Sequence, residues 1–120
     1  MASRARKEAE RRGRWAERYA ALWLQAKGYT ILARRVKLPM GEIDLIARRA
    51  TVLAFVEVKQ RKTLDQALEA VPFTAWQRIS RAADHWASRD QRYAALDWRF
   101  DLVAITPWRL PKHYKDFWRP

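Results

Sequence analysis

Four charged residues recur at a spacing that could carry out metal-dependent chemistry. Glu42 and Asp44 are two residues apart in one predicted strand. Glu57 and Lys59 have the same spacing in the next. Because side chains alternate along a strand, each pair shares one face. Two carboxylates on adjacent strands form a hard-oxygen site suited to Mg²⁺ or Mn²⁺, which activates water and neutralises charge on a phosphodiester.

The register between these two strands decides whether the carboxylates meet. Asp44 and Glu57 lie on the same face of a hairpin only if the intervening loop holds an even number of residues. With Ala50 and Thr51 at the turn, Asp44 stands opposite Glu57, and both carboxylates come within reach of one metal ion. Lys59 could then orient or deprotonate the attacking water and stabilise the transition state.

A simpler interpretation of Glu57 and Lys59 is a solvated salt bridge, which is the commoner meaning of this spacing. The position of the pair favours chemistry instead. Residues 51–59 are almost uninterrupted apolar residues before Glu57, which predicts a strand at the centre of the sheet, where unpaired charges are costly. Glu42 could be an outer ligand, or could pair with Lys59 or Arg61 across the hairpin.

The segment before these strands is predicted to be one long helix. Residues 4–27 are strong helix formers, and Gly28 ends the pattern. One apolar stripe is formed at steps of four, three and four residues by Trp15, Tyr19, Leu22 and Ala26. Residues 1–14 are so rich in arginine and glutamate that we expect a frayed or solvated helix start.

The remaining elements form a single predicted domain over residues 1–120. Strands are expected at 29–37, 42–47, 51–59 and 99–106, and helices at 64–71 and 74–88. Pro107 and Pro111 break the pattern, so we expect residues 107–120 to be an irregular tail, with Phe117 and Trp118 packed against the body.

The charge of the chain favours a polyanionic partner. Lysine and arginine number 25 against 13 acidic residues, a formal charge of +12. Nucleic acid is the first expectation, because an anionic membrane is more usually met by a basic amphipathic helix or a lipid anchor. The absence of cysteine excludes disulfides, thiolate catalysis and cysteine zinc sites. With no apolar run long enough for a signal or a membrane span, we expect a cytoplasmic protein.

Several further side chains are candidates for contact with nucleic acid. Basic residues near the predicted strand ends could hold backbone phosphates close to the metal: Arg34, Arg35, Arg48, Arg49, Arg61 and Lys62. Plain solvation is the alternative role of each. Trp108 and Trp118 are placed to contact a base or a partner, whereas Trp15 is expected in the core. His85 and His113 are expected to be surface or packing residues.

The sequence closely resembles the YraN family of bacterial proteins (uncharacterised protein family 0102). The resemblance is carried by residues 40–47 and 55–61 and extends through residues 99–105 and the pairs at 16–17 and 28–29. That family looks like the restriction-endonuclease fold and is similar to archaeal Holliday junction resolvases, whose nuclease site has the PD-(D/E)xK pattern. The resemblance implies an α/β fold with three α-β-α layers, in which helices flank a central mixed sheet.

The same resemblance implies roles for individual residues. Asp44 and Glu57 become metal ligands, and Lys59 becomes the catalytic lysine. A glutamate on the first helix contributes to the resolvase site, and Glu17 is the matching position, although an exposed helical glutamate is an equal alternative. Gln60 follows the lysine as in several relatives of the fold, where it positions water or substrate, although a solvated amide is the commoner role.

Three functions are consistent with this sequence. The leading hypothesis is a Mg²⁺-dependent DNA endonuclease, acting on branched DNA as the resolvase similarity suggests. A nucleic-acid-binding module with an idle nuclease-like site is the alternative, and a basic scaffold for an acidic protein is the third. Symmetric cleavage of both strands would favour a homodimer.

Overall fold

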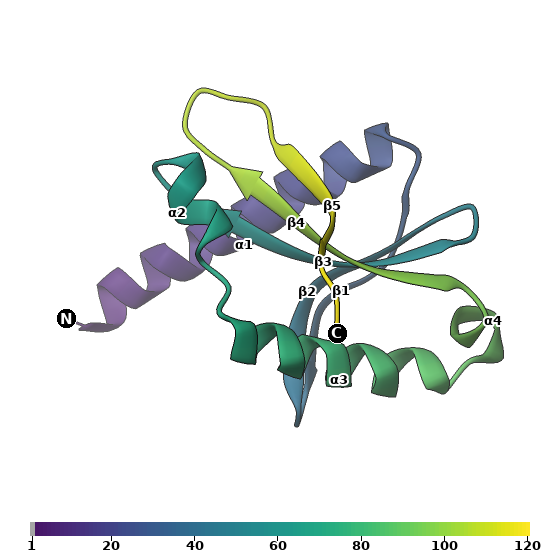
Figure 1. Ribbon diagram of the computed structural model, residues 1–120. Coiled ribbons are helices and arrows are strands. Elements are labelled where there is room, and N and C mark those ends of the chain that lie inside the picture. The colour runs from purple at the N-terminus through teal and green to yellow at the C-terminus, as the bar shows by residue number, and fades with distance from the viewer. Residues whose placement is uncertain (1) are drawn as a thin grey trace.

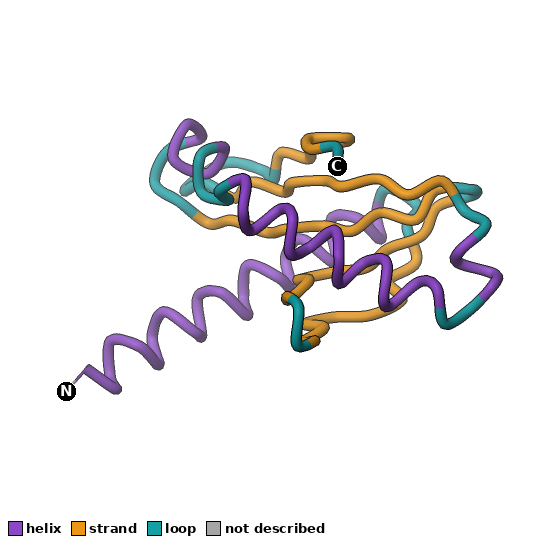
Figure 2. Tube along the Cα trace, turned by 60° about the horizontal axis from the view of Figure 1, so that its bottom comes forward, coloured by secondary structure: helices purple, strands orange, loops and turns teal. Residues whose placement is uncertain are grey.

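The computed structural model describes residues 2–120, and five strands of this part form one mixed sheet between helices (Figures 1 and 2). The strand order follows the chain: β1 (Thr30–Leu38), β2 (Gly41–Arg49), β3 (Val52–Gln60), β4 (Asp97–Ile105) and β5 (Lys112–Trp118). β3 and β4 pair in parallel, and the other neighbouring pairs in this sheet are antiparallel.

Helices cover both faces of the sheet, so the predicted three-layer α-β-α arrangement is confirmed. The long helix α1 (Ala2–Ala26) runs behind the strands in Figure 1. The connection from β3 to β4 holds α2 (Leu64–Leu68), α3 (Phe73–Ser88) and α4 (Gln91–Ala94), and α3 crosses in front of β2. A parallel neighbour requires such a crossover, because a short hairpin can join only antiparallel strands.

The predicted central position of β3 is also confirmed. Every side chain from Leu53 to Val58 is buried. Phe55 packs with Trp76 in the core on the α3 side, and Val56 packs with Leu24 in the core on the α1 side. A strand that is covered on both faces has no exposed side to fill with polar residues, which explains the apolar run.

The apolar face of α1 differs from the one predicted. Trp15 and Leu22 are 53% and 64% exposed, and Ala26 is also exposed. The residues that α1 buries against the sheet are mostly small: Ala16, Ala20, Ala21 and Leu24. Small residues allow a helix to lie close to a sheet, whereas the prediction followed the largest side chains and selected a neighbouring face.

The first half of α1 projects away from the sheet. The helix is continuous from Ala2, and every side chain from Ser3 to Trp15 is exposed. The predicted solvation of this segment is therefore confirmed, whereas its predicted fraying is not seen in residues 2–14. Figure 2 shows the N-terminal turns extending beyond the strands.

The expectation of an irregular tail was wrong over Lys112–Trp118, which forms β5 and pairs with β4. The two prolines fall in the loop before this strand. Trp118 stacks on Trp76 of α3 with ring centroids 5.8 Å apart, so the predicted packing of the tail against the body is confirmed. Strand pairing gave the segment regular structure that its sequence pattern does not reveal.

Gly41 of β2 lies close to the backbone of α3, and replacing it should destabilise the protein. A Cβ at this position would lie 2.8 Å from the backbone oxygen of Arg78. We expect Gly41→Ala to lower the free energy of unfolding by about 1–3 kcal/mol, the usual cost of overpacking. Urea unfolding measures the change.

Gly13→Ala is the matched control for this prediction. A Cβ on Gly13 would meet no described atom within 4 Å, and Gly13 lies inside a helix. This change should stabilise the protein by up to about 1 kcal/mol through helix propensity. An equal effect of the two substitutions would contradict the close approach.

Candidate active site

The hairpin of β2 and β3 has the predicted register. The ladder runs from Arg49↔Val52 at the turn to Leu45↔Val56, and Ala50 and Thr51 make the turn. The ladder ends there, and just beyond it Asp44 and Glu57 are joined by a hydrogen bond between the Asp44 amide and the Glu57 carboxylate. The apolar pattern and the two-residue turn thus bring these carboxylates together.

At Asp44 and Glu57, side chains take the place of the backbone ladder. The amide of Val58 donates to Oδ2 of Asp44 at 2.8 Å, and the amide of Asp44 donates to Oε2 of Glu57 at 3.1 Å. A main-chain N–H of the opposite strand therefore anchors each carboxylate: β3 donates to Asp44, and β2 donates to Glu57. Main-chain anchoring fixes both acids without using a basic side chain to neutralise them.

The two acids carry an unfavourable concentration of negative charge. Glu57 is only 8% exposed. Burial, and then the neighbouring Asp44, raise the pKa of Glu57 well above its usual value, and Lys59 opposes them in part. A site in which like charges are held together without full compensation is one that a cation would stabilise.

Glu17 of α1 joins this cluster. The pKa of Glu17 is raised above its usual value, first by burial and then by Asp44. Arg35 and other basic residues oppose this shift in part. Its Oε1 atom lies 3.7 Å from Nε of Arg35, and its Oε2 atom is buried without a hydrogen-bond partner in the structure. A buried oxygen without a donor fits a cation ligand and does not fit an exposed helical glutamate.

These acids do not make a closed metal cage. Within residues 2–120, no three acidic or histidine side chains already converge as a complete ligand set. Mg²⁺ commonly binds through one or two carboxylates and keeps several waters, with substrate phosphate completing its shell. The oxygens of Asp44 and Glu57, with Glu17 nearby, suit that open type of site.

A cavity of about 340 Å³ lies between α1 and the ends of β2 and β3. Asp44 and Glu17 line it together with the predicted site residues Lys59 and Gln60. Arg61 is also on its wall, and its guanidinium donates to the backbone oxygen of Gln60 at 2.8 Å. One cavity therefore contains carboxylates, an ammonium, an amide and a guanidinium.

The predicted basic residues do not form one cluster. Arg35 and Arg61 lie at the acidic site, and Arg34 and Lys62 are exposed nearby along β1 and after β3. Arg48 and Arg49 flank the hairpin turn, at the far end of β2 from Asp44. This pair therefore does not lie beside Asp44 and Glu57, because residues next to the turn are the most distant from the open end of a hairpin.

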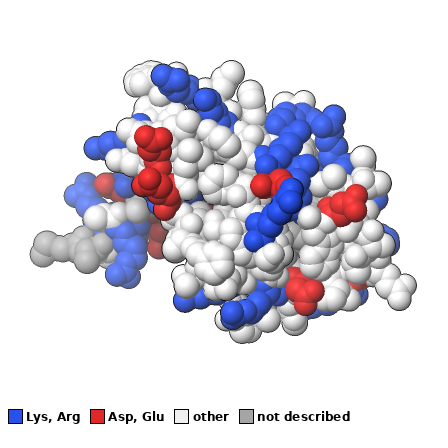
Figure 3. Space-filling view, in the orientation of Figure 1, with Lys and Arg blue, Asp and Glu red and all other residues white. Residues whose placement is uncertain are grey.

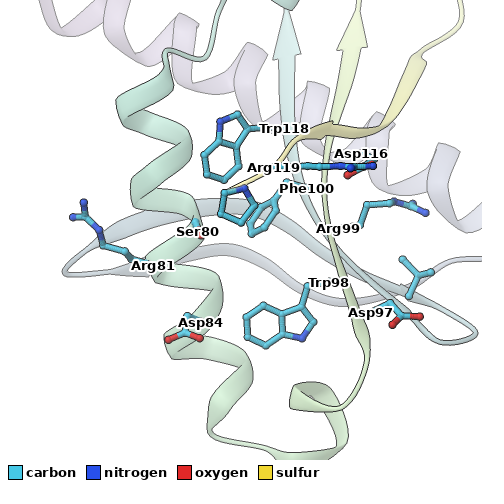
Figure 4. Close-up of a pocket in the computed structure, with 12 residues that line it drawn as sticks. Ser80, Arg81, Asp84, Asp97, Trp98, Arg99, Phe100, Asp116, Trp118 and Arg119 are labelled. Atoms are coloured by element: carbon cyan, nitrogen blue, oxygen red, sulfur yellow. The ribbon is translucent and has the colours of Figure 1, made fainter.

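A larger cavity lies elsewhere. It encloses about 940 Å³ between α3, β4 and the end of β5, with Trp98, Phe100 and Trp118 among its walls (Figure 4). Val52 and Asp97, the first residues of β3 and β4, also line it, whereas Glu57 and Lys59 are at the other end of β3. Its three arginines are matched by three aspartates. Size alone would select this cavity, but the predicted site residues Asp44, Lys59 and Gln60 line the smaller one.

A buried polar network on β4 and β5 was missed by the sequence analysis. Asp101 is fully buried, and its carboxylate accepts hydrogen bonds from Arg99, from Nε2 of His113 at 2.7 Å and from the amide of Asp116 at 3.0 Å. Burial opposes ionisation of Asp101, but these donors together lower its pKa below the usual value. A single aspartate inside the apolar run of residues 100–105 is the signal that could have revealed it.

The predictions for the two histidines are confirmed. His113 is a packing residue with a side chain only 1% exposed, and His85 lies exposed on α3. Because Asp101 accepts from Nε2 of His113, the Nδ1 atom is left to accept from Lys27, whose Nζ lies 2.6 Å away. Neither histidine contributes to the acidic site.

Glu57→Gln should stabilise the protein in the absence of metal. The amide retains an acceptor for the Asp44 N–H and removes a buried negative charge beside another, so we expect a gain of about 0.5–2 kcal/mol near pH 8. With a raised pKa, folded Glu57 binds more protons than unfolded Glu57 above pH 4.5, so wild-type stability falls as the pH rises from there, and the variant lacks this fall. Urea unfolding measures both effects.

Glu69→Gln is the control, because Glu69 is exposed at the end of α2. It should leave stability nearly unchanged. A clear loss of stability in Glu57→Gln near pH 8 would contradict the unfavourable charge cluster.

Comparison with known proteins agrees with the resemblance seen in the sequence. The chain is 51% identical over 121 residues to a UPF0102 protein of Paramagnetospirillum magneticum, covering 98% of this chain and 94% of that protein. It is 54% identical over 114 residues to a UPF0102 protein of Chelativorans sp., covering 95% and 92%. In the described residues, no helix is long and apolar enough to cross a membrane. The model of the uncharacterised protein family UPF0102 matches residues 16–105, and the chain belongs to that family.

Proposed function

We propose that this protein is a metal-dependent DNA endonuclease that hydrolyses phosphodiester bonds. The observation that carries the proposal is the pair of carboxylates on Asp44 and Glu57, anchored to main-chain amides at the open end of the central hairpin. Lys59 shares the adjoining cavity. A solvated salt bridge between Glu57 and Lys59 would not require Glu57 to be buried.

The residues suggest a division of labour. Asp44 and Glu57, with Glu17, would hold Mg²⁺ or Mn²⁺, and the bound ion would lower the pKa of water and neutralise charge on the phosphate. Lys59, which lines the same cavity as Asp44, would orient or deprotonate the attacking water and stabilise the transition state. Gln60 could position water or substrate, and Arg61 on the same wall could bind a neighbouring phosphate.

The surface charge favours DNA as the substrate. The net charge is +12, and basic side chains outnumber acidic ones along the exposed half of α1, which borders the cavity through Arg12. In the view of Figure 3, lysine and arginine also gather over β5 and the C-terminal end of α1, while acidic groups lie over α2. Binding should therefore weaken steeply with salt. We infer action on DNA in the cytoplasm, with a homodimer as the arrangement that would suit paired cleavage.

One observation favours the second candidate, a nucleic-acid-binding module with an idle site. Glu17 is ion-paired with Arg35, and an arginine beside a ligand competes with the metal for it. Under this alternative the protein binds DNA and cleaves none.

A cleavage assay on a panel of DNA structures tests the proposal. Wild-type protein and the Asp44→Ala, Lys59→Ala double variant are incubated with labelled junction, flap, single-stranded and duplex DNA, in Mg²⁺, in Mn²⁺ and in chelator. We expect metal-dependent cleavage by the wild type alone. Faster cleavage of the junction or the flap than of the other substrates would identify branched DNA as the preferred substrate. Binding without cleavage under every condition would support the idle module instead.

A further inference from the structure

An exposed aromatic surface lies beside the acidic cavity. Trp108 is fully exposed in the loop between β4 and β5, and Trp15 and Leu110 are 53% and 66% exposed. Together with Tyr19 and Arg109 they line a hollow of about 430 Å³. We refer to the hollow lined by Trp15, Tyr19, Trp108, Arg109 and Leu110 as the aromatic trough. Exposed apolar side chains that gather in one place mark interaction surfaces.

The aromatic trough is continuous with the proposed active site. Gln60 lines both the trough and the cavity that holds Asp44 and Lys59. On α1, Trp15 of the trough immediately precedes Ala16 and Glu17 of the cavity. A strand of DNA with one phosphate at the acids would therefore have its neighbouring nucleotides at the trough.

The chemistry of the trough suits bases and phosphates together. Trp15 and Tyr19 lie with ring centroids 5.3 Å apart, and the indole of Trp108 is open to solvent. Trp108 has a φ of 62°, a left-handed conformation that is unfavourable for a bulky residue. Arg109 and, across Gln60, Arg61 add positive charge at the edge. Flat apolar faces bordered by arginine are the features that bind single strands.

We propose that Trp15 and Trp108 form a stacking site for unpaired nucleobases, so that the substrate class is DNA with a single-stranded segment next to the scissile phosphate. The link to cleavage rests on the proposed function, whereas the stacking itself does not. Duplex bases are already stacked on one another and do not present their faces to a protein. A second copy of this chain is the less favoured occupant of the trough, because Arg109 at its edge would meet the Arg109 of the other copy if this surface paired with itself.

Binding of two single strands in chelator tests this inference without cleavage. Fluorescence anisotropy compares a labelled oligothymidine with an abasic strand of the same length, which has the same phosphates and no bases. Wild-type protein should prefer the oligothymidine by about tenfold or more, the value of one stacked base. Trp108→Ala should remove most of this preference, and Trp108→Phe should restore most of it.

Phe73→Ala is the matched control, because Phe73 is 63% exposed on α3 and lies outside the trough. It should keep the wild-type preference. Equal affinity of the wild type for the two strands would overturn the inference. So would a wild-type dimer that Trp108→Ala dissociates while its preference for bases is unchanged, since the trough would then bind a second copy.

Cleavage measured on the same preparations separates the two proposals. A base preference without cleavage in Mg²⁺ or Mn²⁺ would leave the stacking site standing and reject the endonuclease. Cleavage without a base preference would reject the stacking site alone.

Discussion

Lys59→Met should lower metal-dependent DNA cleavage by about 10²–10⁴-fold, the usual contribution of a positioned acid or base. Methionine keeps the length and much of the apolar stem of lysine but removes the ammonium from the cavity that Asp44 and Glu17 line. Because binding of the DNA backbone is spread over many basic residues, affinity should change little. Single-turnover cleavage and anisotropy in chelator measure the two effects separately.

Lys62→Met is the matched control for this prediction. Lys62 carries the same charge three residues further along, is exposed, and lines a different cavity with Pro107 and Arg109. Its loss should weaken binding slightly and leave the rate of cleavage in the bound complex intact. Equal loss of rate in the two variants would show that Lys59 contributes only general positive charge.

Asp101→Asn should lower the free energy of unfolding by about 3–5 kcal/mol, the usual result of removing one member of a buried ion pair. The carboxylate of Asp101 accepts two hydrogen bonds from Arg99, both at 2.8 Å, and others from His113 and the amide of Asp116. An amide cannot accept at both of its terminal atoms, so buried donors are left without partners. Urea unfolding measures the loss.

The pH dependence of this effect has a definite sign. Because the pKa of folded Asp101 is lowered, its contribution is complete above its unfolded pKa of about 3.8 and is lost as the pH falls through the folded pKa. The difference between wild type and variant should therefore narrow below about pH 4. Asp97→Asn is the control, since Asp97 is exposed at the start of β4. A difference that grows on acidification would contradict the network.

The contrast between Asp101 and Glu57 helps to separate a structural acid from a functional one. Both are buried carboxylates on the central strands. Donors surround Asp101 and lower its pKa, whereas Glu57 has one main-chain donor, a like-charged neighbour in Asp44 and a raised pKa. In the first arrangement, groups of the chain itself donate all the hydrogen bonds that stabilise the carboxylate of Asp101. A cation would stabilise the second arrangement, which is the property expected of a metal site.

Local patterns were sufficient to predict the centre of this fold. The apolar run of β3, the alternation in β2 and the two-residue turn at Ala50 and Thr51 act over short distances, so the contact between Asp44 and Glu57 followed from the sequence. The resemblance to UPF0102 added Glu17, which spacing alone could not connect with the hairpin. The structure supports that addition by bringing Glu17 into the same cavity as Asp44.

Features that depend on distant contacts were not predictable in the same way. The buried face of α1 is set by the distance between helix and sheet, which favours Ala16 and Ala20 and leaves Trp15 outside. β5 exists through its pairing with β4, and its polar residues Lys112 and Lys115 concealed it. The position of Arg48 and Arg49 followed from the hairpin register itself, but the expectation treated both ends of the hairpin as one site.

Single-turnover cleavage of the preferred DNA is the most direct test of the central claim. Wild-type protein and Asp44→Asn, purified identically, are compared with Mg²⁺ present and after chelation. The proposed mechanism predicts cleavage by the wild type only when the metal is present, and none above background by the variant. Equal cleavage by the variant, or DNA binding by the wild type without cleavage in either metal, would contradict it.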